Sequence, residues 1–133
     1  MSERSATVRS FAKINLDLRV LYKRPDNFHE LRTIFQTISL ADTIRIDYRK
    51  AKTTRLAIEG NIDIPDNLIL RAAQAVLDHG RVSAEVRFGL EKCIPMGAGL
   101  GGGSSNAAAV MLELPVLAGL RIPLETLGRL GHA

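Results

Sequence analysis

The sequence predicts a two-layer α+β domain. Two observations carry this expectation: strand-like alternation dominates the first half of the chain, and helix-spaced segments surround one further strand in the second half. The 133 residues have the length of one domain, and 46% of them are hydrophobic, which is enough to build a buried core. We therefore expect a single domain over residues 1–133.

The first half of the chain is expected to form strands. Residues 8–22 alternate loosely and predict an extended strand, which ends in a turn at residues 23–27, where Pro25 fixes φ. The further strands expected here are residues 31–40, 43–48 and 55–59, the first two separated by a short turn at Ala41 and Asp42. Within residues 43–48 the alternation places Ile44 and Ile46 on one face.

A helix is expected to begin at Asp66 and Asn67, because the apolar residues that follow have helical spacing, and Gly80 is the expected stop. Residues 82–88 then alternate as a half-buried strand does.

A second helix is expected from about Ser104. Pro115 should end or bend it near Leu114, since proline lacks the N–H that a helix interior needs. Pro123 should lie in the first turn of a short final helix.

Composition excludes several classes of protein. A mean hydropathy of +0.05 argues against a disordered chain and a membrane protein, and no apolar run approaches the roughly 20 residues of a membrane span. The one cysteine, Cys93, excludes an internal disulfide and favours a cytoplasmic location. The net charge of +4 is spread along the first half of the chain, which suits anionic ligands but does not choose among them.

The most informative segment is a run of glycines directly before a predicted helix. Glycines occupy positions 97, 99, 101, 102 and 103, and Ser104 and Ser105 follow. Glycine lets the backbone turn tightly and approach a ligand, while a helix that starts at the serines aims free N–H groups at the loop. The segment therefore predicts an anion site, with a nucleotide phosphate as the expected anion and a serine as the expected helix cap.

Two common phosphate loops do not fit this segment. A P-loop needs a lysine after its glycines, and none follows here. The dinucleotide pattern is formally met by Gly97, Gly99 and Gly102, but no strand-like run follows the helix. What remains is Pro-x-x-x-Gly-Leu-Gly-x-x-Ser-Ser, starting at Pro95.

This pattern resembles the phosphate loop of the GHMP kinases. The matching residues are Pro95, Gly99, Leu100, Gly101, Ser104 and Ser105. Residues 12–15, 27–29, 35–36, 66–69 and 95–108 are similar to the branch that phosphorylates 4-diphosphocytidyl-2-C-methyl-D-erythritol (CDP-methylerythritol). The resemblance implies the N-terminal ATP-binding domain of this family, a mixed or antiparallel sheet packed on helices, similar to the second domain of ribosomal protein S5.

The resemblance also implies an activity, which is ATP-dependent phosphorylation of the CDP-methylerythritol hydroxyl in non-mevalonate isoprenoid synthesis. It gives Lys13 the catalytic role, and implies ATP and Mg²⁺ as cofactors, with the Ser105 hydroxyl as a candidate Mg²⁺ contact. The ATP-binding residues that it implies are Asn67, Leu68, Pro95, Met96, Gly97, Ala98, Gly99, Leu100, Gly101, Gly102, Gly103, Ser104 and Ser105. The substrate-binding residues that it implies are Asn15, Phe28, His29 and Phe35.

Structural roles compete with these assignments. Lys13 also fits a lysine at a strand edge, Asn67 and one of the serines fit helix caps, and Phe35 fits a core position. Both roles can hold together for Asn67.

The catalytic aspartate of the family and its C-terminal substrate domain have no counterpart among the 133 residues. We therefore expect the chain to be the nucleotide-binding half, poorly active alone. Apolar surface meant for the other domain should then favour self-association.

Functions of other classes remain open on the sequence alone. A basic chain of this topology also fits an RNA-binding module, or a nucleotide-binding protein without enzymatic activity. Only 5% of the residues are aromatic, which argues against RNA. We accordingly expect ATP and CDP-methylerythritol as partners, with no membrane and no nucleic acid.

Overall fold

The computed structural model describes residues 3–23, 29–97 and 99–131, with side chains described outside residues 15–23 and 29–35. The elements are β1 (Arg4–Lys23), β2 (His29–Lys50), β3 (Arg55–Gly60), α1 (Leu68–Gly80), β4 (Ala84–Glu91), α2 (Gly102–Ala118) and α3 (Leu124–Gly131). The strands form one sheet in the order β1-β2-β4-β3, antiparallel except for the parallel pair of β3 and β4. The predicted α+β class with a mixed sheet is confirmed.

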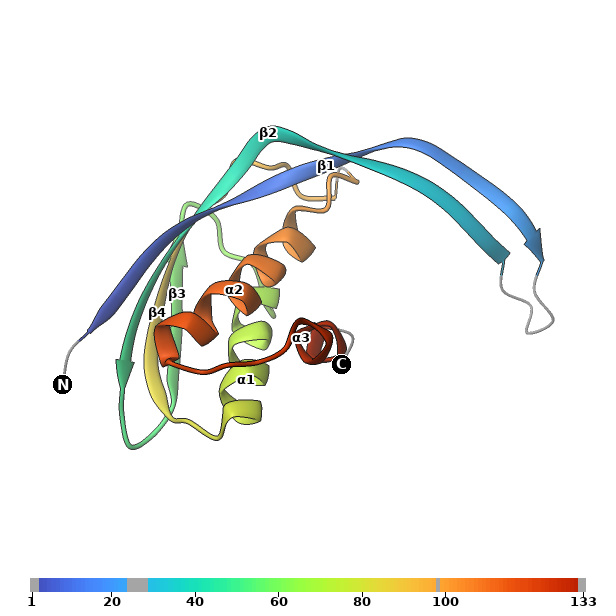
Figure 1. Ribbon diagram of the computed structural model, residues 1–133. Helices are drawn as coiled ribbons and strands as arrows, with labels where there is room; N and C mark the ends of the chain where they lie inside the picture. Colours follow the sequence, from blue (N-terminus) through green and yellow to red (C-terminus); the bar gives the residue numbers. More distant parts are fainter. Residues whose placement is uncertain (1–2, 24–28, 98, 132–133) are drawn as a thin grey trace.

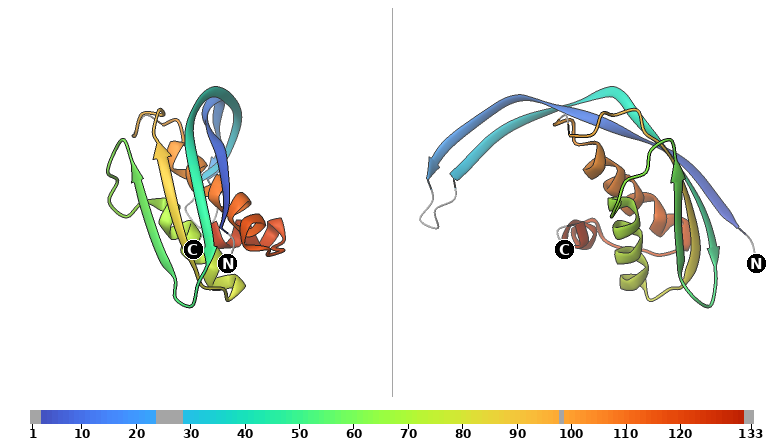
Figure 2. Two further views of the ribbon diagram at one scale, coloured as in Figure 1. Left: turned by 90° about the vertical axis from the view of Figure 1, so that its left-hand side faces the viewer. Right: turned by 180° about the vertical axis from the view of Figure 1, so that it is seen from behind.

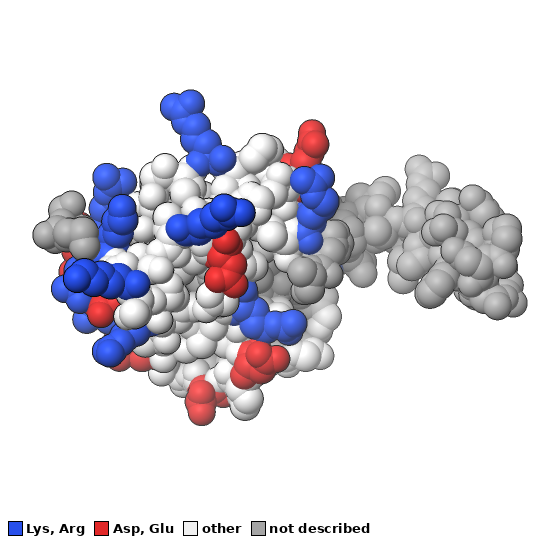
Figure 3. Space-filling model, turned by 90° about the horizontal axis from the view of Figure 1, so that it is seen from below, with Lys and Arg blue, Asp and Glu red and all other residues white. Residues whose placement is uncertain are grey.

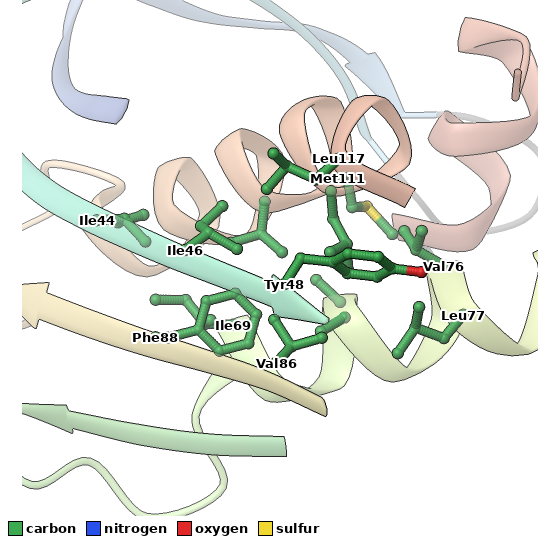
Figure 4. Close-up of a cluster of buried hydrophobic side chains, with 14 of the residues drawn as sticks. Ile44, Ile46, Tyr48, Ile69, Val76, Leu77, Val86, Phe88, Met111 and Leu117 are labelled. Carbon is green, nitrogen blue, oxygen red and sulfur yellow. The ribbon is translucent and has the colours of Figure 1, made fainter. Parts of the chain in front are cut away.

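The domain has two layers. All three helices lie on one face of the sheet, while β1 and β2 continue past it as a long two-stranded ribbon (Figures 1 and 2). Alternate residues of β2 and β4 face the helices and are buried, among them Ile46, Tyr48 and Phe88. They pack against α1 and α2, where Val76 and Met111 belong to the same core (Figure 4).

The turn expected at Ala41 and Asp42 is wrong. Both residues lie inside β2, which runs unbroken from the ribbon into the sheet, and Asp42 pairs with Ser10 of β1. Asp42 has the same phase as Ile44 and Ile46, so its side chain points into the protein and is fully buried. Main-chain amides satisfy its carboxylate there, so the strand does not need to turn it towards water.

The start of α1 and its end at Gly80 are confirmed, although the residue in the left-handed cap position is Arg81 and not a glycine. The Asn67 side chain caps the helix by accepting a hydrogen bond from the Ile69 amide at 2.9 Å. Gly80 is the last helical residue, and Arg81, at φ 52°, adopts the left-handed cap conformation usually given to glycine. β4 begins two residues later than expected and reaches Glu91, because Leu90 is buried on the same face as Phe88.

The predicted serine cap of α2 is wrong. The helix begins at Gly102, and Gly101 at φ 70° occupies the cap position without a side-chain hydrogen bond. A left-handed glycine turns the chain into the helix more sharply than a serine cap would.

The expectation that α2 ends near Leu114 because of Pro115 is also wrong. α2 continues through Pro115 to Ala118 and is capped by Gly119. Pro115 is buried, and Leu117 beyond it joins the core beside Met111 (Figure 4). Burial of this last turn outweighs the lost backbone hydrogen bond. The short final helix α3 is present, but it starts at Leu124, so Pro123 lies directly before its first turn and not in it. The Pro123 carbonyl accepts a hydrogen bond from the Leu127 amide.

Within the described part of the chain, no helix combines the length and the apolar character that crossing a bilayer requires.

Candidate functional site

The glycine loop connects the end of β4 to the start of α2. Gly97, Gly99 and Gly101 all have left-handed backbones, with φ of 72°, 75° and 70°. A residue with a side chain rarely adopts this conformation, so the path of the loop depends on glycine at these positions. The loop lies at the end of the helical layer, below the bend of β1 and β2 (Figure 1).

A pocket of about 360 Å³ opens between the loop and α1. Its lining includes Asn67, Leu68, Pro95, Met96, Gly97, Gly99, Leu100, Gly101, Gly102, Gly103 and Ser104. The structure thus brings together most of the residues that the sequence assigned to ATP. Ala98 lies outside the described residues.

Two helix N-termini meet at this pocket. Asn67 and Leu68 begin α1, and Gly102 and Gly103 begin α2. A Cβ on Gly103 would lie 3.5 Å from the Leu68 side chain, so the N-termini of α1 and α2 lie close together. Each end carries the positive end of a helix dipole. The first amides of α2 have no acceptor within the helix and no side-chain cap, whereas at α1 the Asn67 side chain already accepts from the Ile69 amide. The pocket therefore favours an anion, and α2 offers most of the amides.

Lys13 lies directly against the loop. The register of β1 and β2 shifts between Phe11 and Lys13, and the Lys13 amide donates to the Leu100 carbonyl oxygen at 3.0 Å. Its side chain runs past Gly101, where an added Cβ would come within 2.8 Å of the Lys13 Cε. The lysine thus adds a cation beside the anion pocket, as its proposed role requires.

The two serines take different places. Ser104 lines the pocket and is exposed. Ser105 is half-buried, and its hydroxyl accepts a hydrogen bond from the Ser10 hydroxyl of β1 at 2.8 Å. Of the two, Ser104 is therefore better placed to meet a ligand in the pocket.

Sequence reasoning missed a buried polar cluster below the loop. Asp42 accepts hydrogen bonds from Lys92 Nζ at 2.6 Å, from Asn106 Nδ2 at 2.9 Å, and from the amides of Cys93 and Ile94 at 2.6 and 2.8 Å. Lys92 also donates to Asn106 Oδ1 at 3.1 Å. Lys92 and Asn106 border the pocket from below.

The cluster keeps Asp42 ionised. Burial by itself raises the pKa of this carboxyl, but the hydrogen bonds from Ile94, Lys92, Asn106 and Cys93 outweigh it, so the pKa lies below its ordinary value. The signal in the sequence was the phase of Asp42 with Ile44 and Ile46, which places a charge on the buried face of a strand. A buried charge on such a face needs a partner.

The substrate-side predictions are not tested by the structure. Phe28 lies outside the described residues. Asn15, His29 and Phe35 have described backbones only, in the ribbon of β1 and β2, where Asn15 pairs with Phe35. These two positions are therefore neighbours across the ribbon.

A divalent cation is held by several carboxylate, imidazole or thiolate side chains of the described residues only where these lie close together. They contain no group of three or more His, Cys, Asp or Glu side chains placed to hold a metal ion. The carboxylate of Asp66 at the pocket is exposed and lies 3.7 Å from Arg71.

The chain is similar to a group of kinases along nearly its whole length. The model of the GHMP kinases N terminal domain matches residues 67–133, half of the chain. A curated relative from Solibacter usitatus, named 4-diphosphocytidyl-2-C-methyl-D-erythritol kinase, is 59% identical over 129 residues, which are 97% of this chain and 41% of the relative. A relative of the same name from Acinetobacter baylyi is 44% identical over 126 residues, covering 93% of this chain and 45% of the relative.

Solved structures give the same result. A crystal structure of 4-(cytidine 5'-diphospho)-2C-methyl-D-erythritol kinase matches with a TM-score of 0.80 at 41% identity, covering 96% of this chain and 46% of that one. The Methanococcus jannaschii mevalonate kinase shares the fold, with a TM-score of 0.69 at 16% identity over 96% of this chain and 45% of that one. The chain spans less than half the length of these relatives. It belongs to the GHMP kinase family.

Proposed function

We propose that this chain is the nucleotide-binding domain of an ATP-dependent kinase that phosphorylates a hydroxyl of CDP-methylerythritol, working in the cytoplasm. The observation that carries the proposal is the pocket between the glycine loop and two helix N-termini, with Lys13 beside it. The names of the relatives supply the substrate, since a phosphate pocket does not identify the acceptor by itself.

The proposed reaction moves the γ-phosphoryl group of ATP to the substrate hydroxyl. A new P–O bond forms to that oxygen, the bond between the γ-phosphorus and the bridging oxygen breaks, and ADP leaves. Such a transfer depends on alignment and on neutralisation of charge. The loop amides and the two helix ends would hold the phosphates, and the Lys13 ammonium would stabilise the negative charge on the γ-phosphoryl group during its transfer.

Mg²⁺, when bound with ATP, would neutralise the phosphate oxygens. Ser104 and Ser105 directly follow the glycines of the loop, and Ser104 lines the pocket itself. We assign the proton acceptor of the reaction to no residue of this chain, and we expect the chain alone to bind nucleotide with little turnover.

The surface charge supports a small ligand over RNA. In Figure 3 the Lys and Arg side chains are scattered, with acidic side chains between several of them. Among the described residues, Arg49 is paired with Glu85 and Arg87 with Glu3. Nucleic acid binding calls for a continuous basic stripe, which this face does not present.

The test separates binding from transfer. For binding, the chain is titrated with a fluorescent ATP analogue in the presence of Mg²⁺. For transfer, the chain is fused to the part of the Solibacter usitatus relative that lies outside the matched 129 residues, and phosphorylation of CDP-methylerythritol by this fusion is measured. We expect Lys13→Ala to lower the turnover of the fusion at least a hundredfold while changing the nucleotide Kd less than fivefold. Ser104→Ala should mainly raise that Kd. Phosphorylation that survives Lys13→Ala, or wild-type chain that binds structured RNA but no nucleotide, would contradict the proposal.

A further inference from the structure

Side chains from four parts of the chain form one buried polar cluster below the glycine loop: Ser10 of β1, Asp42 of β2, Lys92 after β4, and Ser105 and Asn106 of α2. We propose that its centre, the Asp42–Lys92 ion pair, is a positioning unit that holds the loop and the first turn of α2 against the strand that carries Lys13. This inference rests on the proposed function and deepens it.

The ion pair fixes the entry of the loop. The same Asp42 oxygen accepts the amides of Cys93 and Ile94, the two residues that lead from β4 to Pro95. Two N–H groups on one carboxylate oxygen define the direction of the chain as well as its distance. The path into the loop is therefore set by β2.

A second set of hydrogen bonds in the cluster holds the first turn of α2 in place. Asn106 donates to Asp42 and to the Ser10 hydroxyl, at 2.9 and 2.8 Å, and Ser10 donates to Ser105. Ser10 precedes Lys13 by three residues on β1. The cluster thus joins the first turn of α2, which lines the pocket, to the strand that places the lysine beside it.

Stability alone is a weak reason for this arrangement. Asp42 is fully buried and the Lys92 side chain is 6% exposed, and a buried ion pair often stabilises a fold no better than apolar residues of similar size. What the pair adds over an apolar contact is direction, because each hydrogen bond restricts an angle. Direction matters most where a loop has to present its amides to phosphates.

The charges of the pair make the inference testable. Lys92 Nζ lies within 2.8 Å of the place that a Cβ on Gly102 would occupy, so the ammonium is directly below the start of α2. Lys92→Met leaves the Asp42 carboxylate without a counter-charge next to the phosphate pocket, where its negative charge repels a nucleotide. Asp42→Asn together with Lys92→Met removes both charges, so the double variant should recover part of the affinity that the single one loses.

Cys93 provides a direct reporter of the loop entry. It is the one cysteine of the sequence, its thiol is exposed, and its amide is bonded to Asp42. A trifluoromethyl label on Cys93 gives a ¹⁹F resonance whose position and width follow the conformation of this segment. Folding of each variant is checked by circular dichroism, and nucleotide Kd is measured with the fluorescent ATP analogue.

We expect Lys92→Met to shift or broaden the ¹⁹F line and to raise the nucleotide Kd at least tenfold, with at least a threefold recovery in the double variant. The matched control is the exposed pair Arg49–Glu85, which also joins β2 to β4, and Arg49→Met should change neither readout. If Lys92→Met does not fold, Ser105→Ala cuts the link to Ser10 without leaving a buried charge, and should broaden the line and raise the Kd about threefold.

Folded variants that keep the wild-type ¹⁹F line and a Kd within twofold of wild type would overturn the positioning role. A wild-type chain that binds no nucleotide, while the ¹⁹F line still responds to Lys92→Met, would overturn the proposed function and leave the positioning role supported.

Discussion

Gly101 is the residue at which the loop, α2 and Lys13 meet. Its φ of 70° disfavours any side chain, and a Cβ would press on the Lys13 Cε. We expect Gly101→Ala to weaken ATP-analogue binding about tenfold, which corresponds to the roughly 1–2 kcal/mol of left-handed strain acting on the loop. Isothermal titration of the folded variant measures the change.

Gly119 offers a matched control for this substitution. It has almost the same φ, 71°, but caps the far end of α2 and has open space around it. Gly119→Ala should lower the free energy of unfolding by about 1 kcal/mol without changing nucleotide affinity. Equal losses of affinity in the two variants would show that Gly101 acts through general stability.

Asp42 makes the stability of the domain sensitive to acid. Its pKa in the folded chain lies below the value of an unfolded aspartate, about 3.9, so the stabilisation is present above that pH and is lost as pH falls through the folded pKa. Urea unfolding between pH 5 and pH 2 should therefore show a steeper loss of stability for the wild type than for Asp42→Asn/Lys92→Met. Identical slopes would mean that the carboxylate is not held in its charged form.

Among the elements, α1 tests whether one residue serves both fold and ligand. Asn67 caps the helix and also lines the pocket. Asn67→Ala should lower the free energy of unfolding by about 1 kcal/mol and weaken nucleotide binding, because the N-terminus of α1 frays. Asn67→Asp keeps the cap but adds a negative charge, so it should retain stability and still weaken binding. An aspartate variant with unchanged affinity would restrict Asn67 to its capping role.

The elements also show which parts of the fold can be predicted from the sequence. Periodicity and caps were sufficient for α1 and for most of β4, because their signals are local. Local rules failed at Asp42, Pro115 and the start of α2. Asp42 stays in a strand because amides 51 and 52 residues away satisfy it, and α2 passes Pro115 because the following turn is buried.

The candidate site was likewise predicted only in part from the sequence. The glycine motif and the resemblance were sufficient to bring the loop, Asn67 and Leu68 to one pocket. They also singled out Lys13, whose side chain packs against Gly101 of the loop. The polar cluster below them was missed, because its members are far apart in the sequence and each looks ordinary there. Asp42 was assigned to a turn and Lys92 to no site, whereas in the fold the Lys92 Nζ and an Asp42 carboxylate oxygen are 2.6 Å apart.

At the scale of the whole molecule, a stripe of exposed apolar residues along α2 is relevant to self-association of the chain. Ala108, Leu112 and Val116 follow one another at intervals of four on the helix and are exposed, Leu112 at 56% and Val116 at 65%. Such a stripe is typical of a helix that packs against something further. We propose that the isolated chain self-associates through it.

Sedimentation of the chain at rising concentration measures this association. Leu112→Gln with Val116→Gln should raise the dissociation constant at least tenfold, while the helical signal in circular dichroism is unchanged. Glu59→Gln, on β3 at the other face of the sheet, is a control that should have no effect. Association that is indifferent to the stripe would place the contact elsewhere.

The proposed phosphate site consists of main-chain amides of residues 96–105, which are expected to bind a triphosphate at the start of α2. Crystals of the chain grown with a non-hydrolysable ATP analogue and Mg²⁺ test this most directly. We predict phosphate oxygens within hydrogen-bond distance of the loop amides, with the terminal phosphate facing the Lys13 ammonium. An analogue bound at another surface, or a loop whose amides are turned away from bound phosphate, would contradict it.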